Sequence, residues 1–250
     1  NRQIAIDKVG INSLSYPITV QDRDRTVQDT IATINMYVDL PHCYRGTHMS
    51  RFIEVISRHN LNLKLDNLDH ILKDMLDTFD CERAHLEVEF PYFIKKKAPV
   101  SQLESLMGYQ CSVTAKMNRG CALELKTGLI APVHSLCPCS REISEYGAHN
   151  QRGEIHIQIR ASHKVWFEEL VTIAEKSASA PVYSLLKRED EKYVTELAYQ
   201  NPKFVEDIAR DVALALKADS RIKWYSVAIK SHESIHNHDA YAAITSEVTK

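Results

Sequence analysis

The spacing of apolar positions along the first half of the chain predicts two strands, two helices and two more strands. Apolar and polar residues alternate in the strand segments, and apolar residues recur every three or four positions in the helical ones. The segments are residues 9–20 and 30–38 (strands), 49–56 and 68–79 (helices), and 86–90 and 113–117 (strands). Thr47 and Asp66 are the expected N-caps of the two helices.

The second half of the chain repeats this order without repeating the sequence. Its apolar pattern predicts strands over residues 121–133 and 154–160, helices over residues 163–176 and 202–216, and strands over residues 222–230 and 239–248. Asn201 is the expected N-cap of the later helix, with Pro202 at its first position. Runs of strands separated by paired helices favour an α+β fold, with antiparallel sheets and helices packed on one face.

Composition and charge narrow the class of protein. Hydrophobic residues make up 44% of the 250 residues and charged residues 26%, as in a soluble globular protein of one large domain or two ordinary ones. A formal net charge of −2 gives no field that would attract nucleic acid or a membrane surface. The basic run Lys95–Lys97 is expected to be a solvated strand end. No signal peptide and no bilayer-spanning apolar stretch are recognised, so neither a membrane nor nucleic acid is expected as a partner.

Cysteine usage indicates a reducing compartment. Six cysteines are spread over the chain, whereas a disulfide scaffold is usually shorter and denser in cysteine. Cys81, Cys111 and Cys121 lie in or beside strand patterns and are expected to be buried. We therefore expect a cytoplasmic protein.

The segment around Cys137 carries the clearest candidate chemistry. Cys137 and Cys139 lie two residues apart, and His149 follows twelve residues after the first thiol. Thiolate and imidazole bind borderline-soft metals such as zinc or ferrous iron. Spacing alone fits a metal site and a buried thiol pair with a surface histidine equally well. A third metal ligand would have to come from elsewhere in the chain.

Histidines and carboxylates later in the chain are less specific. His236 and His238 precede the last strand, where they suit either a shared pocket for proton transfer or an ordinary polar loop. Glu191 lies in a charge run that looks solvated, and Glu206 lies near a helix start that favours carboxylates in any protein. A carboxylate can also complete a Cys/His metal site, or accept two N–H donors from a guanine-like ring.

Cationic side chains surround the expected start of the first helix. His42, Arg45, His48 and Arg51 lie in one short segment of the chain. Helix N-terminal amides together with arginines suit a phosphate group. Ordinary capping and a polar helix face explain the same residues equally well.

Several motifs, in order and over essentially the whole chain, closely resemble GTP cyclohydrolase of the type IB family. They are Asp7-Lys8-Val9-Gly10, Leu40-Pro41-His42, Gly46-Thr47-His48-Met49-Ser50-Arg51-Phe52, Cys137-Pro138-Cys139-Ser140, Tyr146-Gly147-Ala148-His149-Asn150-Gln151-Arg152-Gly153 and Ser234-Ile235-His236-Asn237-His238-Asp239. The set of motifs is far more specific than any one of them alone.

This resemblance implies a fold, an assembly and a reaction. The fold is the tunnelling fold (T-fold), present as two tandem modules over residues 1–119 and 120–250, with most of the metal and catalytic residues in the second. The assembly is a homo-oligomer, expected to be a homotetramer. The reaction converts GTP and water to 7,8-dihydroneopterin triphosphate and formate, the first step of bacterial folate biosynthesis.

The resemblance also implies roles for individual residues. Cys137, His149 and Glu191 resemble the ligands of one divalent metal, which is manganese, iron or zinc in this family. His236 resembles the acid/base catalyst. The other expected substrate-binding residues are Glu206 at the guanine edge, Glu233 as a support of the pocket, and Arg45 and Arg51 at the triphosphate.

Two other functions remain open at this point. Another T-fold pteridine or deazapurine enzyme would use a cysteine as a nucleophile, and chelators would leave its activity intact. A non-catalytic zinc-binding or redox module would hold metal tightly, lose its fold on chelation and show no GTP turnover. The sequence assigns no role to Cys139 or His238.

Overall fold

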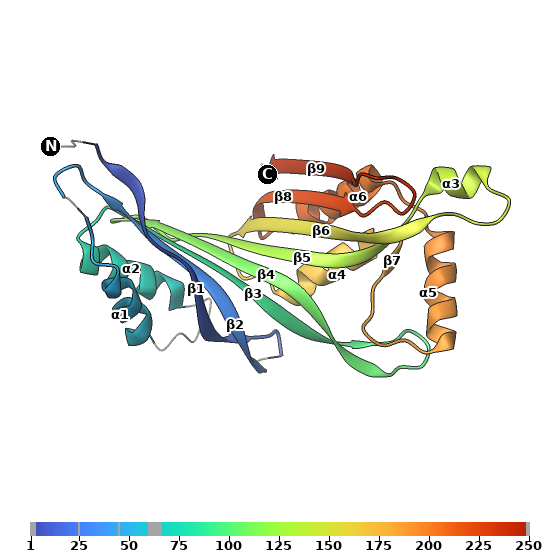
Figure 1. Ribbon diagram of the computed structural model, residues 1–250, viewed down its shortest axis with the longest axis horizontal. Coiled ribbons are helices and arrows are strands. Elements are labelled where there is room, and N and C mark those ends of the chain that lie inside the picture. The colour runs from blue at the N-terminus through green and yellow to red at the C-terminus, as the bar shows by residue number, and fades with distance from the viewer. Residues whose placement is uncertain (1–3, 25, 45, 60–66, 249–250) are drawn as a thin grey trace. The chain divides into compact units, whose positions relative to one another are not determined.

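A computed structural model of the chain describes residues 4–24, 26–44, 46–59 and 67–248 (Figure 1). The chain divides into two compact units. Unit 1 comprises Asn1–Pro91 and Cys111–Thr127, and unit 2 comprises Tyr92–Gln110 and Gly128–Lys250. The predicted division into modules over residues 1–119 and 120–250 stays a prediction.

Unit 1 is built from antiparallel strands and two helices. Its elements are β1 (Ile6–Gln21), β2 (Val27–Leu40), α1 (Ser50–Arg58), α2 (Leu68–Phe79) and parts of β3 (Arg83–Lys97), β4 (Glu104–Asn118) and β5 (Glu124–Leu136). β2 pairs with β1 on one side and with β3 on the other. Phe52 of α1 stacks on Phe79 of α2 with ring centroids 4.2 Å apart. The strands and helices predicted for the first half are therefore confirmed.

Unit 2 contains the remaining elements and the antiparallel strands that matter for the site. Its further elements are α3 (Pro138–Ile143), β6 (Asn150–Ala161), α4 (Phe167–Ser177), β7 (Ala180–Pro181), α5 (Arg188–Gln200), α6 (Val205–Ala218), β8 (Ile222–Ser231) and β9 (Ala240–Glu247). β8 lies between β6 and β9 and pairs with both, and β7 pairs with β5. The buried side chains of α6 include Ile208, Val212 and Leu216, and this helix packs against β8 and β9. The predicted α+β class, with antiparallel strands and helices on one face, is confirmed (Figure 1).

Helix boundaries account for most of the errors in the sequence prediction. α1 begins at Ser50 with Met49 in the N-cap position, so Thr47 is not the cap. α5 was not predicted as a helix, because it buries only Asp190 and Ala198 and therefore shows no apolar stripe. Asn201 is the C-cap of α5 rather than the N-cap of the next helix. The expected cap Asp66 lies outside the described residues.

Two side-chain predictions were also wrong. Cys121 is exposed because it lies in the turn before β5, whereas Cys81 and Cys111 are buried as expected. Lys96 is only 14% exposed, and its Nζ donates to Glu175 Oε1 at 2.6 Å. Burial lowers the pKa of this ammonium group and the Glu175 carboxylate opposes the shift. The basic run is therefore not uniformly solvated. No helix in the described part of the chain is long and apolar enough to cross a membrane.

A fully buried carboxylate, Asp190, joins the start of α5 to the turn between β3 and β4. It accepts hydrogen bonds from the backbone N–H groups of Val100 (2.8 Å), Ser101 (2.9 Å) and Lys187 (2.9 Å). The hydroxyl of Ser101 donates a fourth hydrogen bond at 2.6 Å. Burial by itself raises the pKa of Asp190, but these hydrogen bonds outweigh it and hold the pKa below its ordinary value.

Replacing Asp190 should therefore destabilise the fold in a pH-dependent way. The folded-state pKa lies below the unfolded one, so the stabilisation is complete above the ordinary carboxyl pKa and is lost as the pH falls through the folded-state value. We expect Asp190→Asn to lower Tm at pH 7, with a smaller difference in acid. Thermal melting at a series of pH values measures this. The exposed neighbour Glu189 provides the control, Glu189→Gln, which should melt like the wild type. Equal Tm values for Asp190→Asn and wild type at pH 7 would contradict the assignment.

Candidate functional site

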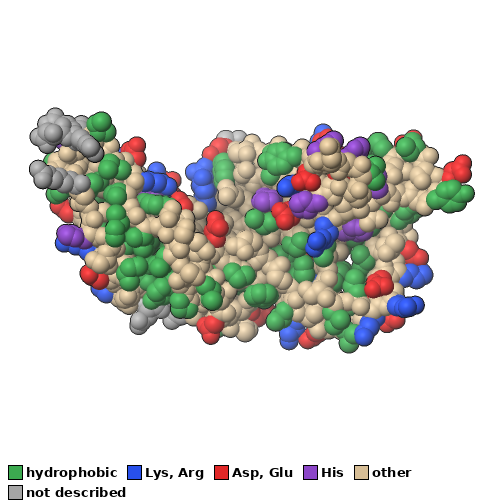
Figure 2. Space-filling view, viewed as in Figure 1, with side chains coloured by type: hydrophobic (Ala, Val, Ile, Leu, Met, Phe, Trp, Pro, Cys, Tyr) green, Lys and Arg blue, Asp and Glu red, His purple; other side chains and the backbone are tan. Residues whose placement is uncertain are grey.

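A cavity of about 310 Å³ in unit 2 gathers residues from three of the motifs. Cys137, His149, Glu206, Glu233 and His236 all line it, although they come from distant parts of the sequence. We call this cavity the Cys137 pocket. The space-filling view shows histidine side chains gathered over this part of unit 2, near β8, β9 and α3 (Figure 2). The structure therefore brings together five of the eight residues that the sequence singled out as site residues.

Cys137 and His149 are neighbours because the backbone holds them together. The N–H of Cys137 donates to the carbonyl oxygen of His149 at 3.2 Å. Cys137 is also the N-cap of α3, and its Sγ accepts a hydrogen bond from the N–H of Ser140 at 3.4 Å. The hydroxyl oxygen of Ser140 accepts from the N–H of His149 at 3.1 Å. The Cys-Pro-Cys-Ser motif thus forms a short helix start that points a sulfur into the pocket, with Pro138 at the first helical position.

A small apolar cluster fixes the residues just before these two ligand candidates. Leu136, Ala180 and Ala198 are buried against one another, and Ala148 packs against them. Leu136 immediately precedes Cys137, and Ala148 immediately precedes His149. Burying these side chains in a close-packed cluster limits the movement of the thiol and the imidazole that follow them.

His149 is oriented by acceptors on one ring nitrogen. Its Nδ1 lies 2.9 Å from Oε1 of Gln151 and 3.9 Å from Oε2 of Glu233. The side chains of His149 and Glu233 are only 13% and 12% exposed. Glu233 thus lies beside His149, and its role as a support of the pocket stays a prediction. The sequence predicts no role for Gln151, although this residue lies within the motif two residues after His149.

The loop between β8 and β9 brings the other histidines to the pocket. Its first residue, His232, donates its N–H to the carbonyl of Arg152 at 2.9 Å. His236 and His238 both line the pocket, and their rings stack with centroids 5.3 Å apart and planes 21° apart. Lys230 Nζ and Asp239 Oδ2 form an ion pair of 2.9 Å across the ends of the loop. The two imidazoles therefore share a pocket from a loop and not from the face of a strand.

Glu206 reaches the pocket from the first turn of α6, where its side chain is exposed. The helix dipole stabilises a carboxylate at this position. Lys203 lines the same pocket, but its Nζ donates to the carbonyl of Ser177 at 3.0 Å and pairs with Asp211 at 2.7 Å. Glu206 is thus the carboxylate of α6 that lines the pocket, whereas the ammonium group of Lys203 is paired with Asp211.

Two predicted site residues lie elsewhere, and a third is outside the described residues. Glu191 is exposed in the first turn of α5 and does not line the Cys137 pocket, so its role as a metal ligand stays a prediction. Arg51 lines a cavity of about 230 Å³ in unit 1 together with Tyr44 and His48. Arg45 lies outside the described residues.

The donors of the pocket suit a divalent metal by their chemistry. A cysteine sulfur and a histidine nitrogen held next to each other are typical ligands of zinc and iron. An acceptor on His149 Nδ1 is the usual arrangement behind a metal-binding imidazole. Within residues 4–24, 26–44, 46–59 and 67–248, no three His, Cys, Asp or Glu side chains are close enough together to hold a metal ion. Cys137 and His149 are two donors that fit such a metal ion, and Glu191 stays the predicted third ligand.

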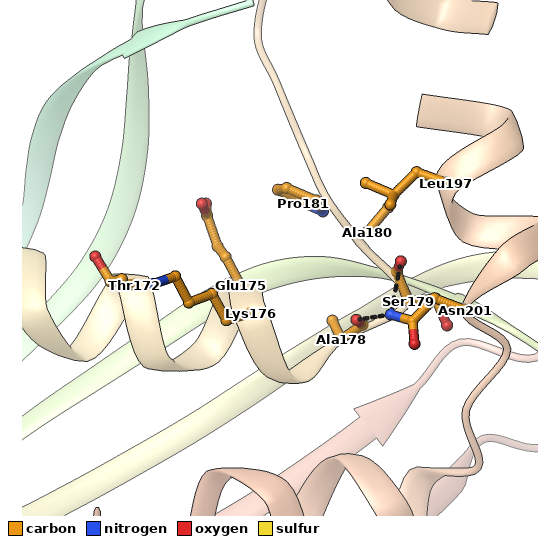
Figure 3. A pocket seen from close by; sticks show the side chains of 9 residues that line it. All are labelled: Thr172, Glu175, Lys176, Ala178, Ser179, Ala180, Pro181, Leu197 and Asn201. Carbon is orange, nitrogen blue, oxygen red and sulfur yellow. Dashed lines mark hydrogen bonds between the residues drawn. The ribbon is translucent and has the colours of Figure 1, made fainter. Parts of the chain in front are cut away.

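A second cavity, of about 340 Å³, shows how the segments around the pocket are braced. It lies between α4 and the end of α5, and Figure 3 shows Asn201 on its wall. Nδ2 of Asn201 donates to the carbonyl oxygens of Ala178 (3.0 Å) and Ser179 (3.2 Å). The hydroxyl oxygen of Ser179 accepts from the N–H of Leu136 at 3.2 Å. This chain of contacts connects the segment before Glu206 to the residue before Cys137.

Removing the Ser179 hydroxyl should weaken this brace measurably. Ser179→Ala leaves the buried N–H of Leu136 without its acceptor, which costs about 1–3 kcal/mol of unfolding free energy. Denaturant unfolding measures the loss. Ser177→Ala is the matched control. The Ser177 hydroxyl donates to the carbonyl of Ile173 in α4, so its removal leaves no N–H group without an acceptor. An equal effect of the two substitutions would refute the role of Ser179.

The fold is similar to that of solved uricases. The uricase from Bacillus fastidious matches with a TM-score of 0.59 and 9% identity, covering 99% of this chain and 94% of that one. The uricase from Arthrobacter globiformis matches with a TM-score of 0.55 and 9% identity, covering 98% and 95%. At this identity the similarity shows the fold alone.

Sequence comparisons give the family. Residues 1–242 match the family described as Type I GTP cyclohydrolase folE2. GTP cyclohydrolase FolE2 of Fervidobacterium nodosum is 53% identical over 247 residues, which is 99% of this chain and 94% of that protein. GTP cyclohydrolase FolE2 of Geobacter sulfurreducens is 52% identical over 249 residues, which is 100% of this chain and 96% of that protein. The motifs predicted a GTP cyclohydrolase, and its assignment to type IB stays a prediction. The chain belongs to the type I GTP cyclohydrolase FolE2 family.

Proposed function

We propose that the Cys137 pocket is the active site of a GTP cyclohydrolase, which converts GTP and water to 7,8-dihydroneopterin triphosphate and formate. This is the first step of folate biosynthesis. One observation carries the proposal: in a chain of the FolE2 family, a thiol, three histidines and two carboxylates from separate motifs line a single cavity.

Cys137 and His149 are the residues that would hold a divalent metal, with Glu191 as the predicted third ligand. Manganese, iron and zinc all suit such a donor set. A bound divalent metal supplies Lewis acidity, which makes water nucleophilic near neutral pH. Cys137 contributes a sulfur held by the start of α3, and His149 contributes a ring whose orientation is fixed from the Nδ1 side.

The other pocket residues bind the substrate and move protons. His236 exchanges protons with the ring nitrogens of the purine as the imidazole ring of GTP opens and formate leaves. Glu206 accepts the two N–H donors on the guanine edge and so holds the base in register with the reacting carbon. Glu233 acts through His149, since its carboxylate lies 3.9 Å from Nδ1 of that ring.

Cations outside the pocket are assigned to the triphosphate. Arg51 is the second residue of α1, in the first turn of the helix, where the free backbone amides also favour phosphate. Arg45 is the second candidate from the same motif. The family resemblance further suggests tandem T-fold modules of the type IB enzymes, a homotetramer and a cytoplasmic location, and we include these in the proposal.

Metal-restored turnover tests the function directly. The protein is stripped of metal with a chelator, Mn²⁺, Fe²⁺ or Zn²⁺ is added back, and the fluorescence of the oxidised pterin product is followed. We expect neopterin triphosphate to form only after metal is added. A folded protein that gives no product with any metal contradicts the proposal. Activity that survives chelation, with Cys137 alkylated in competition with substrate, would instead favour an enzyme with a cysteine nucleophile.

Two substitutions separate metal binding from proton transfer. Cys137→Ala should lose both bound metal and turnover while remaining folded, because it removes a ligand. His236→Ala should keep its metal but lose about 10²–10⁴-fold in kcat, because it removes only the general acid/base. Each variant is the control for the other, with metal content measured by atomic emission and folding by circular dichroism. An active, metal-replete Cys137→Ala protein would remove Cys137 from the ligand set, and a wild-type kcat for His236→Ala would remove His236 as the base.

A further inference from the structure

Gln151 occupies a central place in the pocket. It lies at the start of β6, is half-buried, and lines the Cys137 pocket. Its Oε1 accepts a hydrogen bond from Nδ1 of His149 at 2.9 Å and another from the hydroxyl of Ser234 at 3.4 Å. The two donors belong to different segments, because His149 precedes β6 and Ser234 lies in the loop between β8 and β9. One side-chain oxygen thus joins both sides of the pocket.

The contact with Gln151 determines which nitrogen of His149 carries hydrogen. An amide oxygen can only accept a hydrogen bond, so a hydrogen bond between these two atoms requires the hydrogen to be on Nδ1 of His149. Oε2 of Glu233 lies 3.9 Å from the same nitrogen and favours the same tautomer. In the neutral ring this leaves the lone pair on Nε2. A histidine can bind a metal only through a nitrogen that has its lone pair free.

The contact with Ser234 links Gln151 to the loop that carries His236. Ser234 is two residues from His236 in the loop after β8. Glu233, which faces His149, is its immediate neighbour. Gln151 therefore connects the proposed metal ligand with the segment that carries the proposed acid/base.

We propose that Gln151 is a positioning residue: its side-chain oxygen fixes His149 as the Nδ1–H tautomer, with Nε2 free for a divalent metal, and holds the loop of His236 against the same pocket. The metal part of this assignment rests on the proposed function. The tautomer part does not, because it concerns the metal-free protein alone.

The tautomer is measured first, in metal-free protein. Histidine labelled with ¹⁵N gives long-range ¹H–¹⁵N spectra that distinguish the two neutral tautomers, and His149→Gln identifies the His149 signals. At pH 8 we expect the Nδ1–H form in the wild type and in Gln151→Glu, which keeps an acceptor. Gln151→Met keeps the size of the side chain but has no strong acceptor, so it should lose this preference. A wild-type Nε2–H tautomer, or an unchanged tautomer in Gln151→Met, overturns the proposal.

Metal affinity is measured next, without substrate, by chelator competition with Zn²⁺ or Co²⁺. Loss of the partner behind a ligating histidine weakens metal binding about 10–100-fold, and we expect this for Gln151→Met. Gln151→Glu should restore most of the affinity. Ser234→Ala is the matched control: it removes only the contact to the loop, so it should bind metal like the wild type while kcat falls more than KM changes.

The outcomes separate this inference from the proposed function. If the folded wild-type protein binds no metal, the proposed metal site is refuted. The tautomer of His149, measured in metal-free protein, then still tests the role of Gln151. A wild type that binds metal, together with a Gln151→Met variant of equal affinity and unchanged circular dichroism, refutes the role of Gln151 alone.

Discussion

The antiparallel pairing of β6 with β8 is the constraint on which the Cys137 pocket depends. Its register places Gly153 opposite Ser231, so the start of β6 and the end of β8 lie side by side at the same end of the two strands. A Cβ on Gly153 would lie 3.0 Å from the carbonyl oxygen of Lys230, so this close approach of the two backbones favours glycine. The pairing is what brings His149 within reach of Glu233.

The functional side chains lie next to buried residues in the sequence but are not themselves part of the core. Leu136 and Ala148 are packed into a small apolar cluster, and the next residue in each case is a proposed ligand. Glu206 comes one residue after the start of α6, whose buried face covers β8 and β9. Close packing makes these anchors rigid, so the polar groups beyond them are held in place before a substrate arrives.

The pocket has two sides that are held by different forces. Cys137 and His149 are fixed by backbone hydrogen bonds, by the cap of α3 and by the apolar cluster. The exposed His236 lies on a loop that is held by polar contacts, including the ion pair of Lys230 with Asp239. Polar surface contacts contribute less stability than buried packing. The proposed metal ligands thus lie on the side held by burial and backbone hydrogen bonds, and the proposed acid/base lies on the side held by polar surface contacts.

The sequence by itself determined the alternating strands, the helices with strong apolar stripes and the motif residues that line the pocket, because periodicity and residue chemistry are local properties. It did not reveal α5, which buries only Asp190 and Ala198, nor the place of Asn201, whose side chain binds the carbonyls of Ala178 and Ser179. Only the tertiary structure turned Gln151 toward both His149 and Ser234. The contacts of Gln151 with Ser234 and of Asn201 with Ala178 and Ser179 join segments that are distant in the sequence, so the spacing of residues along the chain does not predict them.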